Sequence, residues 1–509
     1  MARAGFFYPL HLAIYRLLCY TFLKESKEVK MMAMTTRKVI PLPRHVEGED
    51  ASGHFDTVSV SAAISVAHPP FTYHADTLAT YLHRVHGIAL RRGAGGIELL
   101  YDPSLGAEEY RICADDQSVR AYAADEGGAA YAMATLLQLA TPDGERLSFP
   151  KVQIEDGPDC PFRALMVDLA RQWHPFEVLF DYVDLCYLYK IKYLHLHFVD
   201  TQSYTLPSDI FPAISTAGRH YTKAQIRELV VYARERGIEL IPEFEVPGHA
   251  RAMVQAYPAL FAHTPLREGE SISDNIICVG KAALMDNLRA LIAEIIEMFP
   301  DSRYLHLGGD EAEIAEWDKC ADCTRYMREH GIDNVHALYS YFTKEITDLV
   351  LSLGKTPIVW EGFPKEGTET ISRDVVVIAW ESYYHLAPDL IDEGFSIINA
   401  SWQPLYITPN VHWSVENILA WNVYNWQHWW KKSEAHLNPI HLQPTDRVMG
   451  GLLCAWEWNY EGEISIIREN LAALSERTWR IRRYAEDGEF REKLACILPI
   501  AEKLCRGGI

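Results

Sequence analysis

Positive charge and paired cysteines are scarce in this sequence, and each shortage excludes a class of protein. Lys and Arg number 48 against 69 Asp and Glu, which gives a formal net charge of −21. Because phosphate groups are bound by basic patches, we expect neither nucleic acid nor an anionic membrane as the main partner. Of the 10 cysteines, only Cys320 and Cys323 stand close together. With no second Cys-x-x-Cys motif we expect no four-ligand zinc site, and the pair is interpreted as a loop disulfide or two reduced thiols.

Long apolar runs and nucleotide-binding loops are also missing. The apolar stretch 6–23 is interrupted by Pro9, His11 and Arg16 and lacks a clean small-residue cleavage site. We therefore predict no membrane span and no convincing signal peptide, and we expect a cytoplasmic location. Residues 1–34 are interpreted as a leader or a disordered extension. The chain has no phosphate loop, dinucleotide fingerprint or Gly-x-Ser-x-Gly elbow, so none of those sites is expected.

The first part of the chain has the pattern of a small α+β domain. A chain of 509 residues with 49% hydrophobic and 11% aromatic content is long enough for two or three globular domains. Residues 35–157 form the first in our interpretation. A strand is predicted at 56–66 and helices at 75–85 and 127–140, and a turn-rich connector at 155–159 marks the boundary.

From residue 158 the pattern changes to strand, loop and helix in repetition. The clearest helix covers 222–237, where Thr222 and Gln225 form a capping box and Gly237 ends the helix. Eight strand-and-helix units predict a (β/α)₈ barrel over 158–480, followed by a C-terminal helical segment, 481–509, packed on it. The predicted strands are Ala164–Leu169, Tyr193–Val199, Ile238–Phe244, Tyr304–Leu307, Pro357–Trp360, Val375–Trp380, Ser396–Ala400 and Val448–Ala455.

The chain is organised around one strand end, 304–311. Its apolar residues are followed by Gly308 and Gly309 and then by two adjacent acids, Asp310 and Glu311. Neighbouring carboxylates at a barrel rim repel, so their pKa values separate and one can act as an acid while the other stays charged. The plain alternative is that the pair caps the N-terminus of a following helix.

Other polar and aromatic residues also follow the predicted strands. Because the C-terminal ends of barrel strands meet at one face, we expect these side chains to gather there. Three tryptophans suggest an aromatic box around an apolar group or a sugar face, and the acids and the arginine suit sugar hydroxyls. The residues are Asp168, Arg171, His195, His197, Asp200, Glu243, Glu245, His249, Trp360, Trp380, Glu381, Trp402, Tyr406, Trp456 and Glu457.

The histidine pair allows a rival interpretation. His195 and His197 are two residues apart, so they point to one face of a strand and could hold a metal. With His249 and Asp310 they would build a metal-dependent hydrolase. Against this, neither histidine is the last residue of its strand and Asp200 is better placed at the rim, so we favour buried structural histidines and predict no metal.

Four blocks of this rim match one enzyme family in order and spacing. Together they resemble the family 20 glycoside hydrolases, β-N-acetylhexosaminidases of the bacterial type, over about residues 160–480. Residues 35–155 resemble the α+β domain that usually precedes that barrel. The blocks are Arg163-Ala-Leu-Met-Val-Asp168-Leu-Ala-Arg171, His197-Phe-Val-Asp200, Glu243-Phe-Glu245-Val-Pro-Gly-His249 and His306-Leu-Gly-Gly-Asp310-Glu311.

The resemblance implies an exo-acting, retaining enzyme without a cofactor. It would remove terminal β-linked N-acetylglucosamine or N-acetylgalactosamine from oligosaccharides or glycoconjugates, with the substrate's acetamido oxygen attacking the anomeric carbon. It makes Glu311 the general acid and base, Asp310 the group that orients the acetamido N–H, and Tyr406 the donor to the acetamido oxygen. Trp360, Trp380 and Trp456 would enclose the acetamido methyl group.

The alternative from another functional class is a sugar-binding protein without catalytic activity.

The resemblance also assigns the sugar's far end, with departures. Arg171 would hold the O3 and O4 hydroxyls, and Asp200 and His249 would support Glu311 and its neighbours. Thr408 and Trp458 stand where many members carry acids or amides that contact O4 and O6. We therefore add Glu457, the neighbour of Trp458, to the expected sugar-binding residues. The choice between the two amino sugars, the natural aglycone and the oligomeric state stay open. The tryptophan-rich stretch 413–430 is either an aglycone platform or packing against the barrel.

Overall fold

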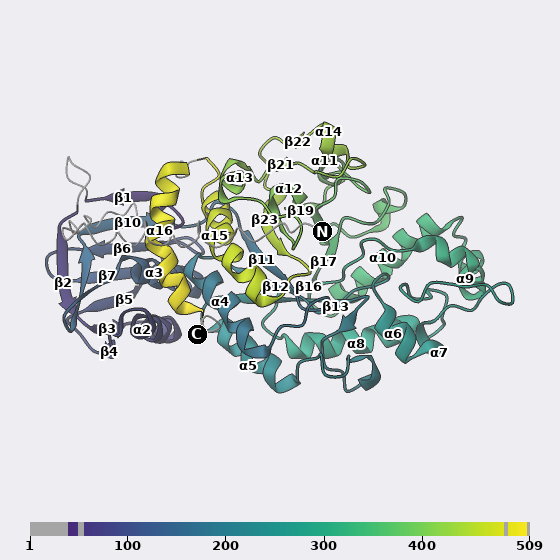
Figure 1. The fold of residues 1–509 in the computed structure, drawn as a ribbon, viewed down its shortest axis with the longest axis horizontal. Helices are drawn as coiled ribbons and strands as arrows, with labels where there is room; N and C mark the ends of the chain where they lie inside the picture. The colour runs from purple at the N-terminus through teal and green to yellow at the C-terminus, as the bar shows by residue number, and fades with distance from the viewer. Residues whose placement is uncertain (1–38, 49–54, 483–486, 506–509) are drawn as a thin grey trace, which may run out of the picture.

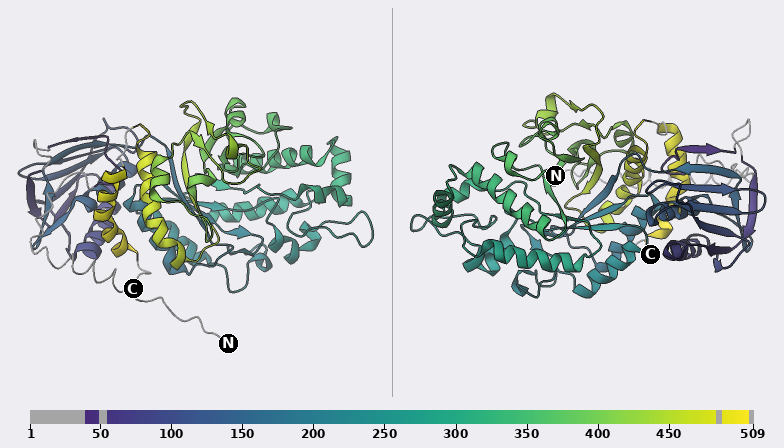
Figure 2. Two further views of the ribbon diagram at one scale, coloured as in Figure 1. Left: turned by 45° about the horizontal axis from the view of Figure 1, so that its top comes forward. Right: turned by 180° about the vertical axis from the view of Figure 1, so that it is seen from behind.

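Two large sheets, one formed before residue 158 and one after it, organise the molecule (Figure 1). The computed structural model describes residues 39–48, 55–482 and 487–505, so the extension expected at 1–34 lies outside the described residues. The first sheet belongs to the N-terminal α+β domain and the second closes into the predicted barrel. Figure 2 shows the two bodies side by side along the long axis, with the C-terminal helix in yellow where they meet.

The N-terminal domain has a seven-stranded sheet in the order β1-β10-β6-β7-β5-β3-β4 and a three-stranded sheet in the order β2-β9-β8. Helices α2 (Thr72–His86) and α3 (Glu126–Leu139) pack together, and α3 lies against β6 and β7 and touches the barrel helix α4. The strands are β1 (His45–Glu47), β2 (Thr57–Ser61), β3 (Ala63–Val66), β4 (Arg91–Arg92), β5 (Ile97–Tyr101), β6 (Tyr110–Ala114), β7 (Val119–Ala123), β8 (Thr141–Asp143), β9 (Arg146–Pro150) and β10 (Val152–Asp156).

One prediction in this domain was wrong. The expected single strand at 56–66 is two strands, β2 and β3, which belong to different sheets. Val58, Val60 and Ile64 are all buried, so the alternation of buried residues continues through the bend at Ala62. The sequence pattern therefore carries no sign of the point where the chain changes sheets.

The second sheet is the predicted (β/α)₈ barrel. Eight parallel strands follow one another around it, and β11 pairs with both β12 and β23, which closes the cylinder. Each predicted strand is confirmed to within two residues at either end. The strands are β11 (Phe162–Asp168), β12 (Tyr193–His197), β15 (Glu239–Glu243), β16 (Tyr304–His306), β17 (Thr356–Trp360), β18 (Val376–Ala379), β19 (Ser396–Asn399) and β23 (Val448–Ala455).

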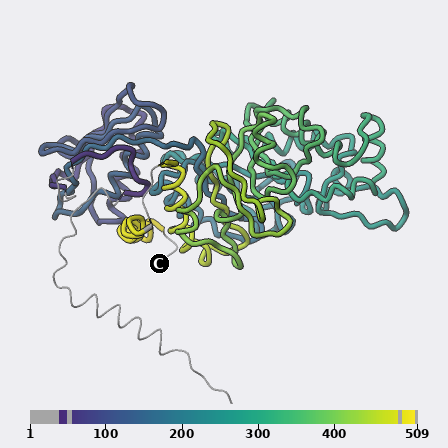
Figure 3. Tube along the Cα trace, turned by 90° about the horizontal axis from the view of Figure 1, so that it is seen from above, coloured from purple at the N-terminus to yellow at the C-terminus, as the bar shows by residue number. Residues whose placement is uncertain are grey.

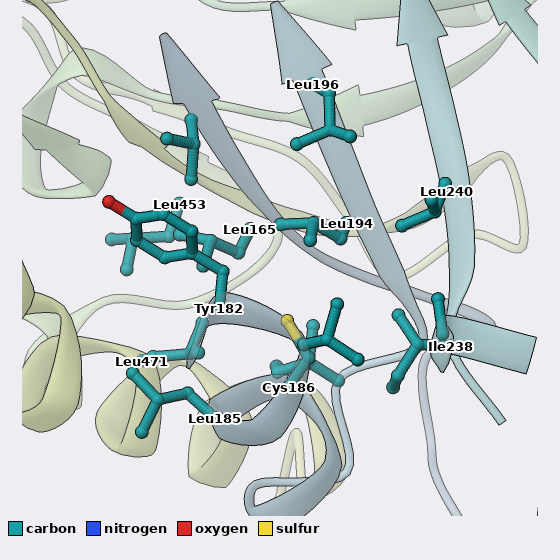
Figure 4. Packing of buried hydrophobic residues seen from close by; sticks show 14 of the residues in the cluster. Leu165, Tyr182, Leu185, Cys186, Leu194, Leu196, Ile238, Leu240, Leu453 and Leu471 are labelled. Atoms are coloured by element: carbon teal, nitrogen blue, oxygen red, sulfur yellow. The ribbon is translucent and has the colours of Figure 1, made fainter. Parts of the chain in front are cut away.

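Helices cover the outside of the barrel because each carries an apolar face. Figure 4 shows Tyr182 and Cys186 of α4 directed toward leucines of the neighbouring strands, among them Leu165 and Leu194. The capping box of Thr222 and Gln225 is present at the start of α5, and that helix ends at Arg234. The main outer helices are α4 (Leu179–Leu188), α5 (Lys223–Arg234), α8 (Leu284–Met298), α10 (Val335–Ser352), α11 (Ala387–Asp392), α13 (Val415–Ala420) and α15 (Tyr460–Trp479).

The last helix joins the two bodies. Helix α16 (Asp487–Leu504) packs against α2 of the N-terminal domain as well as against α4 and α15 of the barrel. The C-terminal helical segment thus packs against both domains, and not on the barrel alone. Within the described ranges, no helix has both the length and the apolar character needed to cross a membrane.

Two long rim segments project from the barrel on the side opposite the N-terminal domain (Figure 3). The first, 244–283, follows β15 and contains α6 (Arg251–Ala256) and α7 (Pro258–Phe261). The second, 307–334, follows β16 and contains the 3₁₀ helix η5 (Ile314–Lys319) and α9 (Ala321–His330). Both start at the C-terminal ends of their strands, so they rise from the face where functional residues are expected.

Candidate active site

The adjacent acids lie on the rim segment after β16. Gly308 and Gly309 have φ angles of +66° and +93°, and Glu311 has a φ of +48°. No helix follows at once, because the next element is η5 and no side chain caps its N-terminus. The alternative that Asp310 and Glu311 form a helix cap is therefore wrong. Glu311 is exposed, whereas Oδ1 of Asp310 is buried and has no hydrogen-bond partner among the described residues.

A buried glutamate, Glu243, lies beneath these acids at the end of β15. The indole N–H of Trp360 donates to its Oε1 over 2.6 Å, and Nδ1 of His197 lies 2.6 Å from its Oε2. His306 Nδ1 and His195 Nε2 are 2.9 and 3.0 Å from its two oxygens. Burial opposes ionisation, but the three histidines hold the pKa of Glu243 well below its usual range.

A charged chain leads from this network to the rim. Oδ2 of Asp200 lies 2.8 Å from Nη2 of Arg171 and 3.0 Å from Nε2 of His197. Oδ1 of Asp200 lies 3.4 Å from Nδ1 of His249. Despite burial, Glu243 and Asp200 raise the pKa of His197 to about 10, so this imidazole is a cation. His249 Nε2 is 3.7 Å from Oε2 of Glu311. His249 thus links Asp200 to Glu311.

The carboxyl groups at the rim have different proton affinities. Burial raises the pKa of Asp310 to about 6, which His249 opposes and Glu311 reinforces. Burial and then the nearby Asp310 raise the pKa of Glu245 well above its usual range. Burial and neighbouring carboxylates raise the pKa of Glu381 to about 8. The rim therefore combines neutral and ionised acids at neutral pH, as acid–base chemistry requires.

Five aromatic side chains form a box beside the acids. Trp360 lies 6.2 Å from Trp380 and 5.9 Å from Trp456 between ring centroids. Tyr406 stacks on Trp402 at 4.4 Å and faces Trp380 at 6.3 Å with an angle of 13° between planes. Desolvation, with the charge of Asp310 among its further causes, raises the pKa of Tyr406 well above its usual range. The three predicted indoles and the tyrosine are thus brought together.

Arg171 and Glu457 close one end of this box. The Arg171 guanidinium carbon lies 4.9 Å from the Trp456 ring centre, and its Nε is 4.0 Å from Oε1 of Glu457. Glu457 has a φ of +61°, and its backbone N–H donates to Asp168 over 3.1 Å. Its side chain is 59% exposed. A cation and an acid of this kind can each bind sugar hydroxyls.

Thr408 and Trp458, the two departures from the family pattern, face elsewhere. The hydroxyl of Thr408 donates to the carbonyl of Val411 over 2.8 Å and accepts its N–H over 2.9 Å. Trp458 lies near His412, with ring centres 5.9 Å apart. After β23, Glu457 is therefore the acid that lies beside Arg171.

The histidine pair does not form the metal site of the rival interpretation. His195, Glu243 and His306 lie close enough together to bind one metal ion, and so do His197, Glu243 and Glu245. Within the part of the chain that the structure describes, no candidate group contains both histidines, and neither shares one with Asp310. His195, His197 and Asp310 are thus not brought together around one ion, and the candidate group at the acids is a separate one formed by His249, Asp310 and Glu311.

Sequence reasoning missed one supporting residue, Tyr339 of α10. Its hydroxyl donates to the carbonyl of Gly309, which fixes the peptide just before Asp310. A single tyrosine on an amphipathic helix carries no sequence signal for this contact. Glu243, Glu245 and Glu381 were noticed at strand ends, but only the structure places them under and beside the acids.

Comparison with known proteins identifies the same family that the sequence motifs resemble. The model of the glycosyl hydrolase family 20 catalytic domain matches residues 160–481, and the model of domain 2 of that family matches residues 36–157. A beta-hexosaminidase of Vibrio furnissii is 28% identical over 411 residues, which are 75% of this chain and 66% of that protein. One from Akkermansia muciniphila is 32% identical over 286 residues, 52% of this chain and 58% of that protein. The matched part spans less than two thirds of each relative.

Solved structures share the fold. The family 20 exo beta-N-acetylglucosaminidase of Vibrio harveyi in complex with N-acetylglucosamine has a TM-score of 0.79, with 22% identity over 92% of this chain and 78% of that one. The beta-N-acetylhexosaminidase of Bacteroides fragilis has a TM-score of 0.75, with 22% identity over 92% and 96%. Because the model of the catalytic domain matches residues 160–481, which are more than half of this chain, the chain belongs to glycosyl hydrolase family 20.

Proposed function

We propose that this chain is a retaining exo-β-N-acetylhexosaminidase that uses the substrate's own acetamido group. The observation that carries the proposal is the position of Oδ1 of Asp310. This atom is buried, has no hydrogen-bond partner among the described residues, and lies beside the aromatic box that includes Tyr406. A 2-acetamido group offers an N–H to that oxygen and a methyl group to the indole walls. A glucoside offers neither.

The proposed reaction proceeds in two steps. Glu311 protonates the glycosidic oxygen while the acetamido oxygen attacks C1, so the C1–O bond breaks and the aglycone leaves with the proton. Glu311, now ionised, then takes a proton from water, which attacks C1 and restores the acetamido group with retained configuration. Asp310 accepts the acetamido N–H and opposes the positive charge of the cyclic intermediate, and Tyr406 donates its O–H to the acetamido oxygen.

An exo mode fits the closed end of the box. Arg171 is 19% exposed and is fixed by Asp200 and Asp168, so it forms a wall behind the sugar. A chain that continued past O4 would meet this wall and Glu457. In the proposal, Arg171 and Glu457 hold the hydroxyls of the terminal sugar.

The tryptophan-rich stretch divides between the two roles considered for it. Trp421 and Trp426 are buried, and the Trp426 indole donates to a barrel carbonyl, so these two are packing. Trp429 is 46% exposed and lies 5.5 Å from Trp402 between ring centroids. We place the aglycone against Trp429 and the exposed Tyr383.

Two substitutions and one substrate pair test the proposal. Glu311→Gln and Asp310→Asn should each lower kcat by about 10²–10⁴-fold with an aryl β-N-acetylglucosaminide. Glu313→Gln, an exposed acid on the same segment, is the matched control and should stay active. The aryl β-glucoside should hardly react. Equal rates on both substrates would mean a direct carboxylate nucleophile, and a fully active Glu311→Gln would end the assignment, whereas binding without turnover in the wild type would favour the silent sugar-binding protein.

A further inference from the structure

Three cysteines and a histidine meet where the two projecting rim segments touch. The sulfur of Cys278 lies 3.5 Å from that of Cys320 and 3.6 Å from that of Cys323. Nδ1 of His263 is 4.0 Å from the Cys323 sulfur, and the four atoms lie within 4.8 Å of one another. All three cysteines are fully buried. The four donors therefore point into one small space away from the acids.

The spacing of the four donors suits one tetrahedral metal ion. Zn–S bonds of about 2.3 Å at tetrahedral angles place sulfur atoms about 3.8 Å apart, close to the separations found here. Both separations exceed an S–S bond of about 2.05 Å by far. Three converging thiols also cannot all be paired with one another. Thiolate sulfur and imidazole nitrogen together are the donors that zinc prefers over harder cations.

The histidine is held in the form that binds a metal. Nε2 of His263 lies 3.1 Å from the carbonyl oxygen of Ile276, which can only accept, so this nitrogen carries the proton. In the neutral ring Nδ1 then carries the lone pair, and it lies on the side of the sulfurs. Histidine ligands of zinc commonly donate their other N–H to a backbone carbonyl in this way.

The chain is packed tightly around the cysteines. Gly280 lies so close to the neighbouring chain that a Cβ would be 2.2 Å from the Asp322 backbone. The two segments are thus packed backbone to backbone around the sulfurs.

The cluster joins the segments that carry the acids. His263 and Cys278 belong to the segment that also carries Glu245 and His249, and Cys320 and Cys323 follow Asp310 and Glu311 on the other. Two backbone bonds flank the cluster, from Leu266 N–H to Lys319 O at 2.9 Å and from Ala321 N–H to Thr264 O at 2.8 Å. The helices here are short, and small units with little core are commonly stapled by a metal.

We propose that His263, Cys278, Cys320 and Cys323 bind one structural zinc ion that clamps the two rim segments behind the catalytic acids. All four positions are filled by protein, so the ion has no open site for a substrate and takes no part in the reaction. Its role is to hold the segments in register. This revises the expectation of no four-ligand zinc site, which counted only Cys-x-x-Cys pairs.

The test is the metal content of the 509-residue chain, purified without a histidine tag or added metal. Elemental mass spectrometry should find about one zinc per chain. Cys320→Ser and His263→Ala should lose the zinc, whereas His263→Cys should keep it. Cys496→Ser, a partly exposed cysteine outside the cluster, is the matched control and should also keep it.

Two further measurements keep the proposal open to refutation if a variant fails to fold. Wild-type protein refilled with Co(II) should show the ligand-field and thiolate charge-transfer absorption of a tetrahedral sulfur site. Unfolded wild-type protein should yield reactive thiols for all cysteines and release its zinc to a chromogenic chelator. Absence of zinc together with no cobalt spectrum would overturn the proposal, as would an intact mass showing a disulfide among these cysteines. Glu311→Gln should retain its zinc, so the metal result is independent of the proposed activity.

Discussion

Replacing Gly308 with alanine should damage this enzyme far more than the same change at Gly331. Both glycines have a φ of +66°, so an alanine pays the same backbone strain at either site, about 1–2 kcal/mol. A Cβ on Gly331 would meet nothing within 4 Å. A Cβ on Gly308 would lie 1.7 Å from Oε2 of Glu245. The difference between the two variants therefore isolates that one contact.

The expected size of the difference follows from the burial of Glu245. The carboxyl group must move until the contact reaches at least 3.0 Å, the shortest that real Cβ atoms make. Glu245 is 1% exposed, and forcing extra volume into a packed interior costs about 1–3 kcal/mol. Glu245 also accepts the N–H of Gly309 over 3.3 Å, so Asp310 moves with it. A displacement of about 1 Å at reacting groups can lower the rate about 10²-fold.

The assay compares the thermal midpoint and kcat/KM of both variants with those of the wild type. Gly331→Ala should lower the midpoint slightly and leave kcat/KM unchanged, and Gly308→Ala should lower both clearly. Shortening the obstructing side chain in the double variant Gly308→Ala, Glu245→Asp should restore part of the loss, since contacting residues couple. Equal effects at the two glycines, or no rescue, would refute the reasoning.

Three other predictions concern charge, support and the aglycone. Asp310 must be ionised in the reaction, and burial raises its pKa to about 6, so kcat/KM with a highly activated leaving group should fall as the pH drops through about 6. His249 lowers the pKa of Asp310, so His249→Gln should shift this acidic limb of the pH profile to higher pH. An acidic limb at the same pH in the variant would contradict the prediction. Trp360→Phe removes a hydrogen bond to the buried Glu243 carboxylate, so unfolding should become easier by about 1.5–3 kcal/mol, measurable by denaturant titration, and an unchanged midpoint speaks against it. Trp429→Ala should raise KM for a disaccharide more than for an aryl glycoside, and equal changes would remove the aglycone role.

The barrel could be predicted because its strands are buried on both sides. Parallel strands in such a sheet read as short apolar runs ended by polar or glycine residues, as 304–309 illustrates. The N-terminal domain was harder at one place, because the alternation of Val58, Val60 and Ile64 runs through a change of sheet. Burial patterns report which residues face a core, and two cores in succession give the same pattern as one.

The rim could be predicted for the same geometric reason, since parallel strands end at one face. What the sequence could not supply was contact between separate segments. Tyr339 reaches Gly309 from a helix that follows the rim segment. His263 and Cys278 meet the Cys-x-x-Cys pair only because two long loops fold against each other. Such meetings depend on tertiary packing, and no local spacing encodes them.

The two adjacent acids differ because of what lies beneath them. Glu243 is ionised, and the cationic His197 offsets part of its charge under the rim. Burial and the neighbouring acids raise the pKa of Glu245 well above its usual range, so it keeps its proton, which spares Asp310 a further buried negative charge. Asp310 can then ionise near neutral pH, while Glu311 stays exposed at the mouth. A single negative charge at Asp310 can therefore face the positive intermediate, and Glu311 is left free to exchange a proton with the leaving group and water.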